Sequence, residues 1–147
     1  MSITAEIAKE FRFEAAHFLP NVAESHQCHK IHGHSYRVIV RAEGKLDENL
    51  GWVMDLNDLS KKFAPVLGML DHALLNEVKG LENPTGENVA LWILVNLGER
   101  LNELSSVTVE ATNRIAITIK RKDVDFTGYN HMKIADLSEK IIHDETD

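Results

Sequence analysis

The sequence is poor in cysteine, in long apolar runs and in basic residues, and each shortage excludes a class of protein. Cys28 is the one cysteine, so an internal disulfide is excluded and a reducing, cytoplasmic location is favoured. The longest apolar run, residues 89–95, is too short to cross a membrane, and the N-terminal residues lack the apolar segment of a secretory signal. Lys and Arg total 16 against 23 Asp and Glu, a net charge of −7, which argues against a nucleic-acid partner but leaves room for a small anion.

The pattern of hydrophobic residues predicts a single α+β domain. Alternating polarity predicts strands over residues 6–16, 34–43, 107–112 and 115–120. Helical spacing predicts one helix that begins near residues 57–58 and is kinked or interrupted at Pro65, and a second helix that Thr85 caps. The order strand, strand, helix, helix, strand, strand is typical of two helices on one face of a four-stranded antiparallel sheet.

The length and composition fit one domain followed by a short tail. The chain has 147 residues, and 44% of them are hydrophobic, which suffices for one buried core. We expect residues 1–122 to form the domain. Residues 123–147 form a tail in which a short helix is expected near residues 134–142.

Three histidines are placed so that they could hold one metal ion. His32 and His34 are two apart where the second predicted strand begins, so both side chains project from the same face. His17 continues the alternation of the first predicted strand at its end. Three imidazoles with an open fourth position are typical of a catalytic zinc site, although nickel, copper or iron also fit three imidazoles. His26 and His29 are rival ligands that rank lower, because neither pairs in strand geometry with another candidate.

Cys28 lies in a polar stretch between the first two predicted strands, beside His29 and Lys30. A lone cysteine is commonly a small buried hydrophobic residue. The functional alternative is a nucleophile or base, because positive neighbours and a nearby metal ion lower the pKa of a thiol. A third alternative is a fourth metal ligand, which would close the metal site and make it structural.

Two further positions could carry proton transfer or ligand binding. Asp71 precedes His72 just after the first predicted helix, and an Asp can orient an imidazole for acid–base work. A helix-terminal His favoured by the helix dipole is an equal alternative. Glu110 alternates with Val109 and Ala111 on a predicted strand. Its carboxylate is either solvated or binds the N–H groups of a ligand in pairs.

Six short motifs run through residues 5–121. They are Phe13-Glu14-Ala15-Ala16-His17, Cys28-x-x-x-His32-Gly33-His34, Gly51-Trp52-Val53-Met54-Asp55, Leu70-Asp71-His72-x-x-Leu75-Asn76, Glu82-Asn83-Pro84-Thr85 and Glu110. In this order they resemble the 6-pyruvoyl-tetrahydropterin synthase family. The three-residue gap between Cys28 and His32 resembles the branch that makes 6-carboxy-5,6,7,8-tetrahydropterin in the queuosine (7-deazaguanine) pathway of bacteria.

The resemblance implies the tunnelling fold (T-fold), in which subunits of a homo-oligomer pair their sheets into a β-barrel and active sites form between subunits. It implies a lyase that converts 7,8-dihydroneopterin triphosphate to 6-carboxy-5,6,7,8-tetrahydropterin, acetaldehyde and triphosphate. The residues it implicates are His17, His32 and His34 as zinc ligands and Cys28, Asp71, His72 and Glu110 as catalytic residues. The cysteine would be the base, the Asp–His pair would relay protons, the glutamate would anchor the pterin ring, and zinc would polarise the side-chain hydroxyls of the substrate.

Some points stay open at this stage. Family members commonly have Thr directly after the ring-binding Glu, whereas here Ala111 follows and Thr112 comes next. The candidate cations for the triphosphate are Arg12, Lys30, Arg37 and Lys120. The alternative functions are a synthase that eliminates triphosphate to form 6-pyruvoyltetrahydropterin without carbon–carbon cleavage, and a non-catalytic zinc-binding scaffold.

Overall fold

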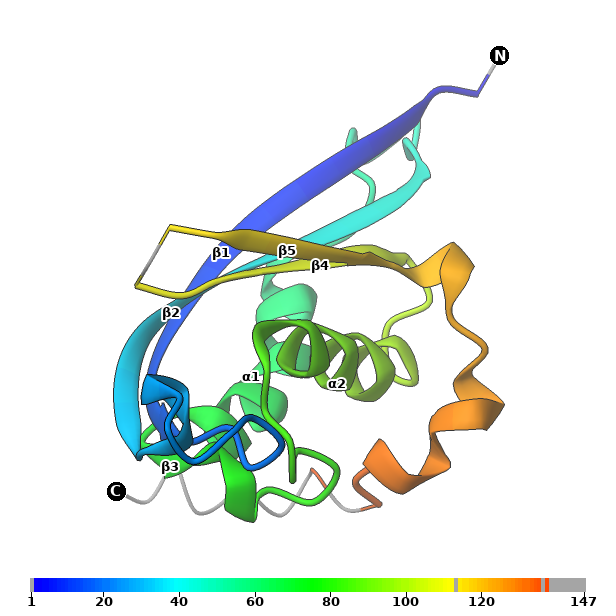
Figure 1. The fold of residues 1–147 in the computed structure, drawn as a ribbon. Helices are drawn as coiled ribbons and strands as arrows, with labels where there is room; N and C mark the ends of the chain where they lie inside the picture. Colours follow the sequence, from blue (N-terminus) through cyan, green and yellow to red (C-terminus); the bar gives the residue numbers. More distant parts are fainter. Residues whose placement is uncertain (1, 113, 136, 138–147) are drawn as a thin grey trace.

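The computed structural model describes residues 2–112, 114–135 and 137, and two α-helices lie on one face of its five-stranded sheet (Figure 1). In chain order the elements are β1 (Thr4–His17), β2 (His32–Lys45), α1 (Leu56–Leu70), β3 (Ala73–Leu74), α2 (Gly86–Gly98), β4 (Leu104–Glu110) and β5 (Ala116–Lys120). The order across the sheet is β3-β1-β2-β4-β5. The α+β architecture and the four antiparallel strands agree with the sequence prediction.

Strands β1 and β2 form a long ribbon that ends at the candidate metal ligands. Each strand has 14 residues, and they pair antiparallel from Thr4–Lys45 to His17–His32. Strand β2 therefore begins at His32, earlier than predicted. Near this end, the rings of Phe13 and Tyr36 stack in the core with centroids 4.7 Å apart.

Strand β3 is the element that the sequence pattern missed. It has two residues and pairs in parallel with Ala15 and Ala16 at the end of β1. Two residues are too few to show an alternation of polarity. Because β3 follows α1 after a two-residue connection, it brings Asp71 and His72 to the sheet edge beside β1.

The two helices cover the core face of the sheet. The carboxylate of Asp55 caps α1 and accepts a first-turn N–H at 2.9 Å, so α1 begins earlier than predicted. Pro65 lies buried inside α1, and the helix runs on to its end without the predicted interruption. Helix α2 begins as predicted, with the Thr85 hydroxyl accepting the N–H of Asn88 at 3.1 Å. Its Trp92 side chain is fully buried in the core, a position in which each large apolar side chain contributes ~2–3 kcal/mol of stability.

The chain after β5 packs against the domain. Residues Arg121–Asp123 and Phe126–Met132 form short 3-10 helices, and the second lies against α2 (Figure 1, orange). The buried Asn96 side chain of α2 donates to the Met132 carbonyl at 3.0 Å and accepts the N–H of Ile134 at 2.9 Å. Hydrogen bonds to Asn96 therefore hold the described part of the predicted tail against α2.

The helix expected near residues 134–142 falls mainly on residues outside the described part of the chain, and it stays a prediction. The division at residue 122 also stays a prediction. Among the described residues, no helix combines the length and apolar character that crossing a bilayer requires.

Candidate metal centre and active site

The ends of β1 and β2 bring three histidines together. His17 is the register partner of His32, and His34 projects from the same face of β2 two residues later. One ring nitrogen from each of the three lies within 4.8 Å of the other two. Three nitrogens bound to a single zinc ion at ~2.0–2.1 Å lie roughly 3.3 Å apart, so a small closure of this cluster gives the spacing of a metal site.

The hydrogen bonds of two of these rings leave the Nε2 atom of each ring without a hydrogen. His17 Nδ1 lies 2.8 Å from the Pro84 carbonyl, and His32 Nδ1 lies 2.7 Å from the Lys30 carbonyl. A carbonyl only accepts, so both Nδ1 atoms donate. The two Nε2 atoms then face each other 3.0 Å apart with lone pairs, an arrangement that a cation between them stabilises. This donor set, with two of the three rings fixed by a backbone carbonyl, fits a metal ion bound through neutral imidazole.

Burial favours the neutral form that a metal requires. Desolvation lowers the pKa of His17, which is 7% exposed, and the neighbouring His32 and His34 lower it further. The pKa of His34 is lowered for the same two reasons, burial first and His32 second. Both rings are therefore neutral at neutral pH and free to donate a lone pair.

Cys28 opens into the same cavity as the three histidines. It lies in the 3-10 turn Gln27–His29, is half-buried, and lines with them a cavity of about 770 Å³ between the sheet and the start of α2. His26 and His29 are not part of the histidine cluster among the described residues. His26 Nδ1 instead accepts the backbone N–H of Cys28 at 3.0 Å, which helps to fix the turn.

The cavity also contains residues that the sequence did not single out. Tyr36 and Glu87 line it, as do Ile115 and Ile117 of the β4–β5 hairpin. Burial raises the pKa of the Tyr36 phenol, which therefore stays protonated. Glu87 follows the Thr85 cap of α2, and its first-turn position has an ordinary structural explanation. Only the packing of α2 against the sheet brings it to this cavity.

Asp71 and His72 are hydrogen-bonded to the backbone of β1. Asp71 Oδ1 accepts the N–H of Glu14 at 3.0 Å and lies 3.0 Å from His72 Nδ1, while the His72 N–H donates to the Glu14 carbonyl at 2.6 Å. These bonds hold His72 at a φ of 60°, a left-handed conformation that costs a non-glycine residue about 1–3 kcal/mol. The His72 side chain is 80% exposed, so its Nε2 faces outward.

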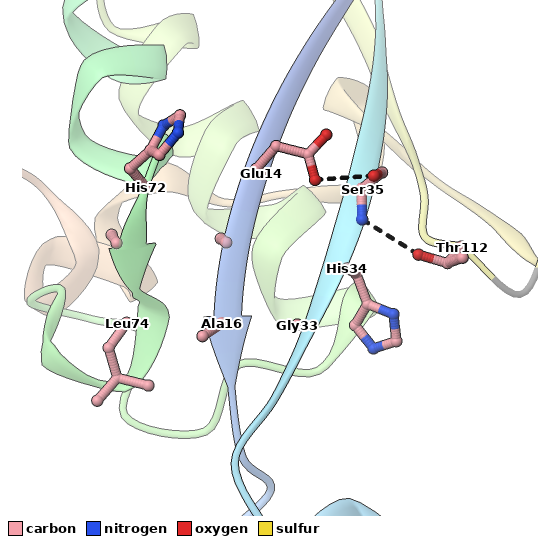
Figure 2. A pocket seen from close by; sticks show the side chains of 10 residues that line it. Glu14, Ala16, Gly33, His34, Ser35, His72, Leu74 and Thr112 are labelled. Carbon is pink, nitrogen blue, oxygen red and sulfur yellow. Dashed lines mark hydrogen bonds between the residues drawn. The ribbon is translucent and has the colours of Figure 1, made fainter.

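His72 lines a different cavity from Cys28. This second cavity, of about 540 Å³, lies across β3, β1 and β2, where Glu14, Ser35 and Thr112 stand side by side (Figure 2). The Ser35 hydroxyl donates to Glu14 at 2.7 Å, and the Ser35 N–H donates to the Thr112 hydroxyl at 3.1 Å. His34 borders both cavities, but Cys28 and His72 of one chain do not share either.

Glu110 lies at the end of β4 on the face of the sheet opposite the helices. Its register partner on β2 is Arg37, and Arg37 Nη1 donates to Glu110 Oε2 at 2.9 Å. The Glu110 side chain is 27% exposed and does not line the cavity of Cys28. Within one chain the predicted site residues therefore lie in three places: the histidine cluster with Cys28, the Asp71–His72 pair, and Glu110.

The predicted cations differ in how they are engaged. Arg12 and Arg37 both pair with Glu10. Lys120 lines a third cavity, of about 830 Å³, at the far end of the sheet. Lys30 is exposed, and its backbone carbonyl contacts His32 of the histidine cluster. Of the four candidate cations, Lys30 is the closest in sequence to His32.

Known proteins resemble this chain in sequence and in fold. The 6-carboxy-5,6,7,8-tetrahydropterin synthase of Synechocystis is 43% identical over 98 residues, covering 63% of this chain and 74% of that protein. The dihydroneopterin monophosphate aldolase of Pyrococcus furiosus is 35% identical over 97 residues, covering 66% and 78%. The structure of Caenorhabditis elegans 6-pyruvoyl tetrahydropterin synthase superposes with a TM-score of 0.75 at 28% identity, covering 80% of this chain and 96% of that one.

The family match covers nearly all of the predicted domain. Residues 6–122 match 6-pyruvoyl tetrahydropterin synthase, a span that contains the histidine cluster, Cys28, the Asp71–His72 pair and Glu110. The predicted fold class agrees with the solved structures. The chain therefore belongs to the 6-pyruvoyl tetrahydropterin synthase family.

Proposed function

We propose that this chain is a zinc-dependent carbon–carbon lyase that converts 7,8-dihydroneopterin triphosphate and water to 6-carboxy-5,6,7,8-tetrahydropterin, acetaldehyde and triphosphate, in the queuosine pathway. The observation that carries the proposal is the cavity shared by Cys28 and three histidines whose ring nitrogens converge. The 43% identity to a protein named for this product supports the choice of branch.

The metal would be held by His17, His32 and His34. When bound, zinc supplies a Lewis acid that polarises the side-chain hydroxyls of the substrate. The Pro84 and Lys30 carbonyls keep two of the rings in the tautomer that presents Nε2. Three protein ligands leave a coordination position for substrate, which distinguishes a catalytic site from a closed structural one.

Cys28 would remove a proton from the side chain of the substrate. Cys28 lines the same cavity as the three histidines, so a substrate bound beside them would contact it. Removing that proton leaves negative charge on the substrate next to the cation site, where it is stabilised, and both triphosphate loss and carbon–carbon cleavage then become easier.

Asp71 and His72 would relay protons to the Cys28 site of a neighbouring copy. In one chain the two groups open into different cavities, so their joint action requires a second subunit. Asp71 orients the imidazole through Nδ1 and leaves the exposed Nε2 for proton transfer. A homo-oligomer with active sites between subunits satisfies this requirement.

Glu110 would anchor the pterin ring. A carboxylate accepts two adjacent N–H groups at once, and the 2-amino and ring N–H groups of a pterin form such a pair. The partly exposed side chain at the end of β4 is open to a ligand on the sheet face opposite the helices. The Thr112 hydroxyl oxygen already accepts the Ser35 N–H.

Mass spectrometry of the products tests this function. Zinc-loaded protein is mixed with 7,8-dihydroneopterin triphosphate, and we expect 6-carboxytetrahydropterin together with acetaldehyde. A pyruvoyl product without acetaldehyde would assign the chain to the activity named for its C. elegans neighbour. No product from folded, zinc-bound protein would leave the non-catalytic zinc scaffold as the better explanation.

The number of phosphates on the substrate is tested by a separate comparison. One relative is named an aldolase of dihydroneopterin monophosphate. The same assay is therefore run in parallel with the monophosphate. We expect kcat/KM to be higher for the triphosphate, and the reverse order would contradict the substrate that we propose.

A further inference from the structure

Arg37 joins two carboxylates across three strands of the sheet. It lies on β2 directly opposite Glu110 of β4, and Nη1 donates to Glu110 Oε2 at 2.9 Å. Its Nε donates to Glu10 of β1. The guanidinium is thus attached at two points, through different nitrogens, and its planar group holds a fixed direction.

This arrangement is unlike that of a cation awaiting an anionic ligand. Glu10 and Glu110 already supply two negative charges to Arg37, and Glu10 also pairs with Arg12 at 3.0 Å. The four side chains sum to zero charge. Because two carboxylates already pair with Arg37 through its Nε and Nη1, the structure argues against Arg37 as a triphosphate ligand.

The attachment of Glu110 leaves its binding capacity intact. A carboxylate has about four lone-pair sites on two oxygens, and Arg37 uses one of them on Oε2. The other oxygen and the remaining lone pairs stay available to a ligand among the described residues, because Arg37 is the one side chain that hydrogen-bonds to Glu110 there. Arg37 therefore fixes the plane of the carboxylate without blocking it.

We propose that Arg37 is a positioning residue for Glu110, which it keeps oriented so that the carboxylate accepts the paired N–H groups of a pterin ring. This inference rests on the proposed function, because it takes the pterin as the ligand of Glu110. An oriented carboxylate loses less rotational freedom when the ligand binds. A residue at position 37 that donates no hydrogen bond would leave the Glu110 carboxylate free to rotate.

The test measures binding of pterin itself, which lacks the side chain and the phosphates and so reports the ring alone. Zinc-loaded full-length protein is titrated against pterin by fluorescence. We expect Arg37→Met to weaken binding about tenfold, since hydrogen bonds to charged groups are the strong ones. Arg37→Lys should restore part of the affinity because it keeps one cationic donor, and zinc affinity should be unchanged in both variants.

A double-mutant cycle separates positioning from a general structural effect. In a Glu110→Gln background, Arg37→Met should change pterin affinity by less than about twofold, because the group through which it acts has gone. Arg41→Met is the matched control. Arg41 lies on the same face of β2 and donates to the Thr108 hydroxyl of β4 at 2.6 Å, but it does not touch Glu110.

Two results would overturn the inference. One is an affinity of Arg37→Met within about twofold of wild type; the other is an equal loss in the presence and absence of Glu110, which would mark a structural role. Absence of pterin binding by the wild-type protein is a different outcome. It would overturn the proposed function of the site, and this inference with it.

Discussion

The Nε2 atoms of His17 and His32 lie 3.0 Å apart across the last residue pair of the β1–β2 ribbon. Each ring donates from its other nitrogen to a backbone carbonyl, from His17 to Pro84 and from His32 to Lys30. The contact therefore joins two acceptors rather than a donor and an acceptor. A cation at this point removes the repulsion, and we expect metal binding to stabilise the end of the ribbon.

Replacing His32 by Ala should abolish tight zinc binding. Loss of an outer-shell partner already costs about 10–100-fold in metal affinity, and loss of a ligand costs at least as much. Zinc per chain is measured by elemental analysis after dialysis, and affinity by competition with a chelator. The control is His131→Ala, since His131 is exposed on the C-terminal segment. Full zinc content in the His32 variant would contradict the assignment.

The zinc-free protein should lose stability on acidification. Burial lowers the pKa of His17 below its ordinary value of 6.5, so the unfolded chain takes up the proton first as the pH falls. Stability is then complete above 6.5, falls below it and levels off beneath the folded-state pKa. Urea unfolding at about pH 7.5 and about pH 5.5 measures the difference. A His17→Gln variant should show a smaller difference, and an equal one would refute this source of the pH dependence.

Replacing Cys28 by Ala should remove turnover and retain zinc. General acid–base groups contribute about 10²–10⁴-fold to rate, so kcat should fall by that amount. The half-buried side chain contributes little to folding. Zinc content and thermal stability are measured beside the rate. Loss of zinc with collapse of the fold would instead make Cys28 a fourth structural ligand.

Two inactive variants should restore activity when they form mixed oligomers. Cys28→Ala and His72→Ala damage different cavities of one chain, so a site between unlike subunits can receive both intact residues. Random mixing after co-expression predicts about a quarter of the wild-type sites. The control mixture is Cys28→Ala with His34→Ala. Both residues belong to one cavity of one chain, so no site regains both, and restored activity there would refute this division.

Replacing Asn96 by Ala should destabilise the fold by about 2–3 kcal/mol, because buried backbone groups lose their hydrogen-bond partner. The Asn96 side chain is 3% exposed and bonds to Trp92, Met132 and Ile134. Urea unfolding at fixed protein concentration measures the change. Asn49→Ala, in an exposed turn, should change stability very little. Equal stability of the two variants would show that the C-terminal segment is not held to α2 through Asn96.

Local patterns predicted the elements whose side chains repeat with a regular period. The alternation that ends at His17, and the spacing of His32 and His34, placed three imidazoles on one face of two neighbouring strands, and the structure brings them together. The Thr85 cap was predicted because N-cap chemistry is local. Strand β3 was not predicted because two residues show no alternation, and its parallel pairing with β1 is a tertiary contact.

The sequence by itself determined the candidate metal ligands, because strand periodicity depends on near neighbours in the chain, and its motifs carried the resemblance to the family. Only the tertiary structure decided which of the predicted site residues lie in the same cavity or contact one another. It placed Cys28 with the histidines, His72 in another cavity and Arg37 on Glu110. These contacts join residues on different elements, and their geometry depends on how the helices and strands pack together. No local pattern encodes that packing.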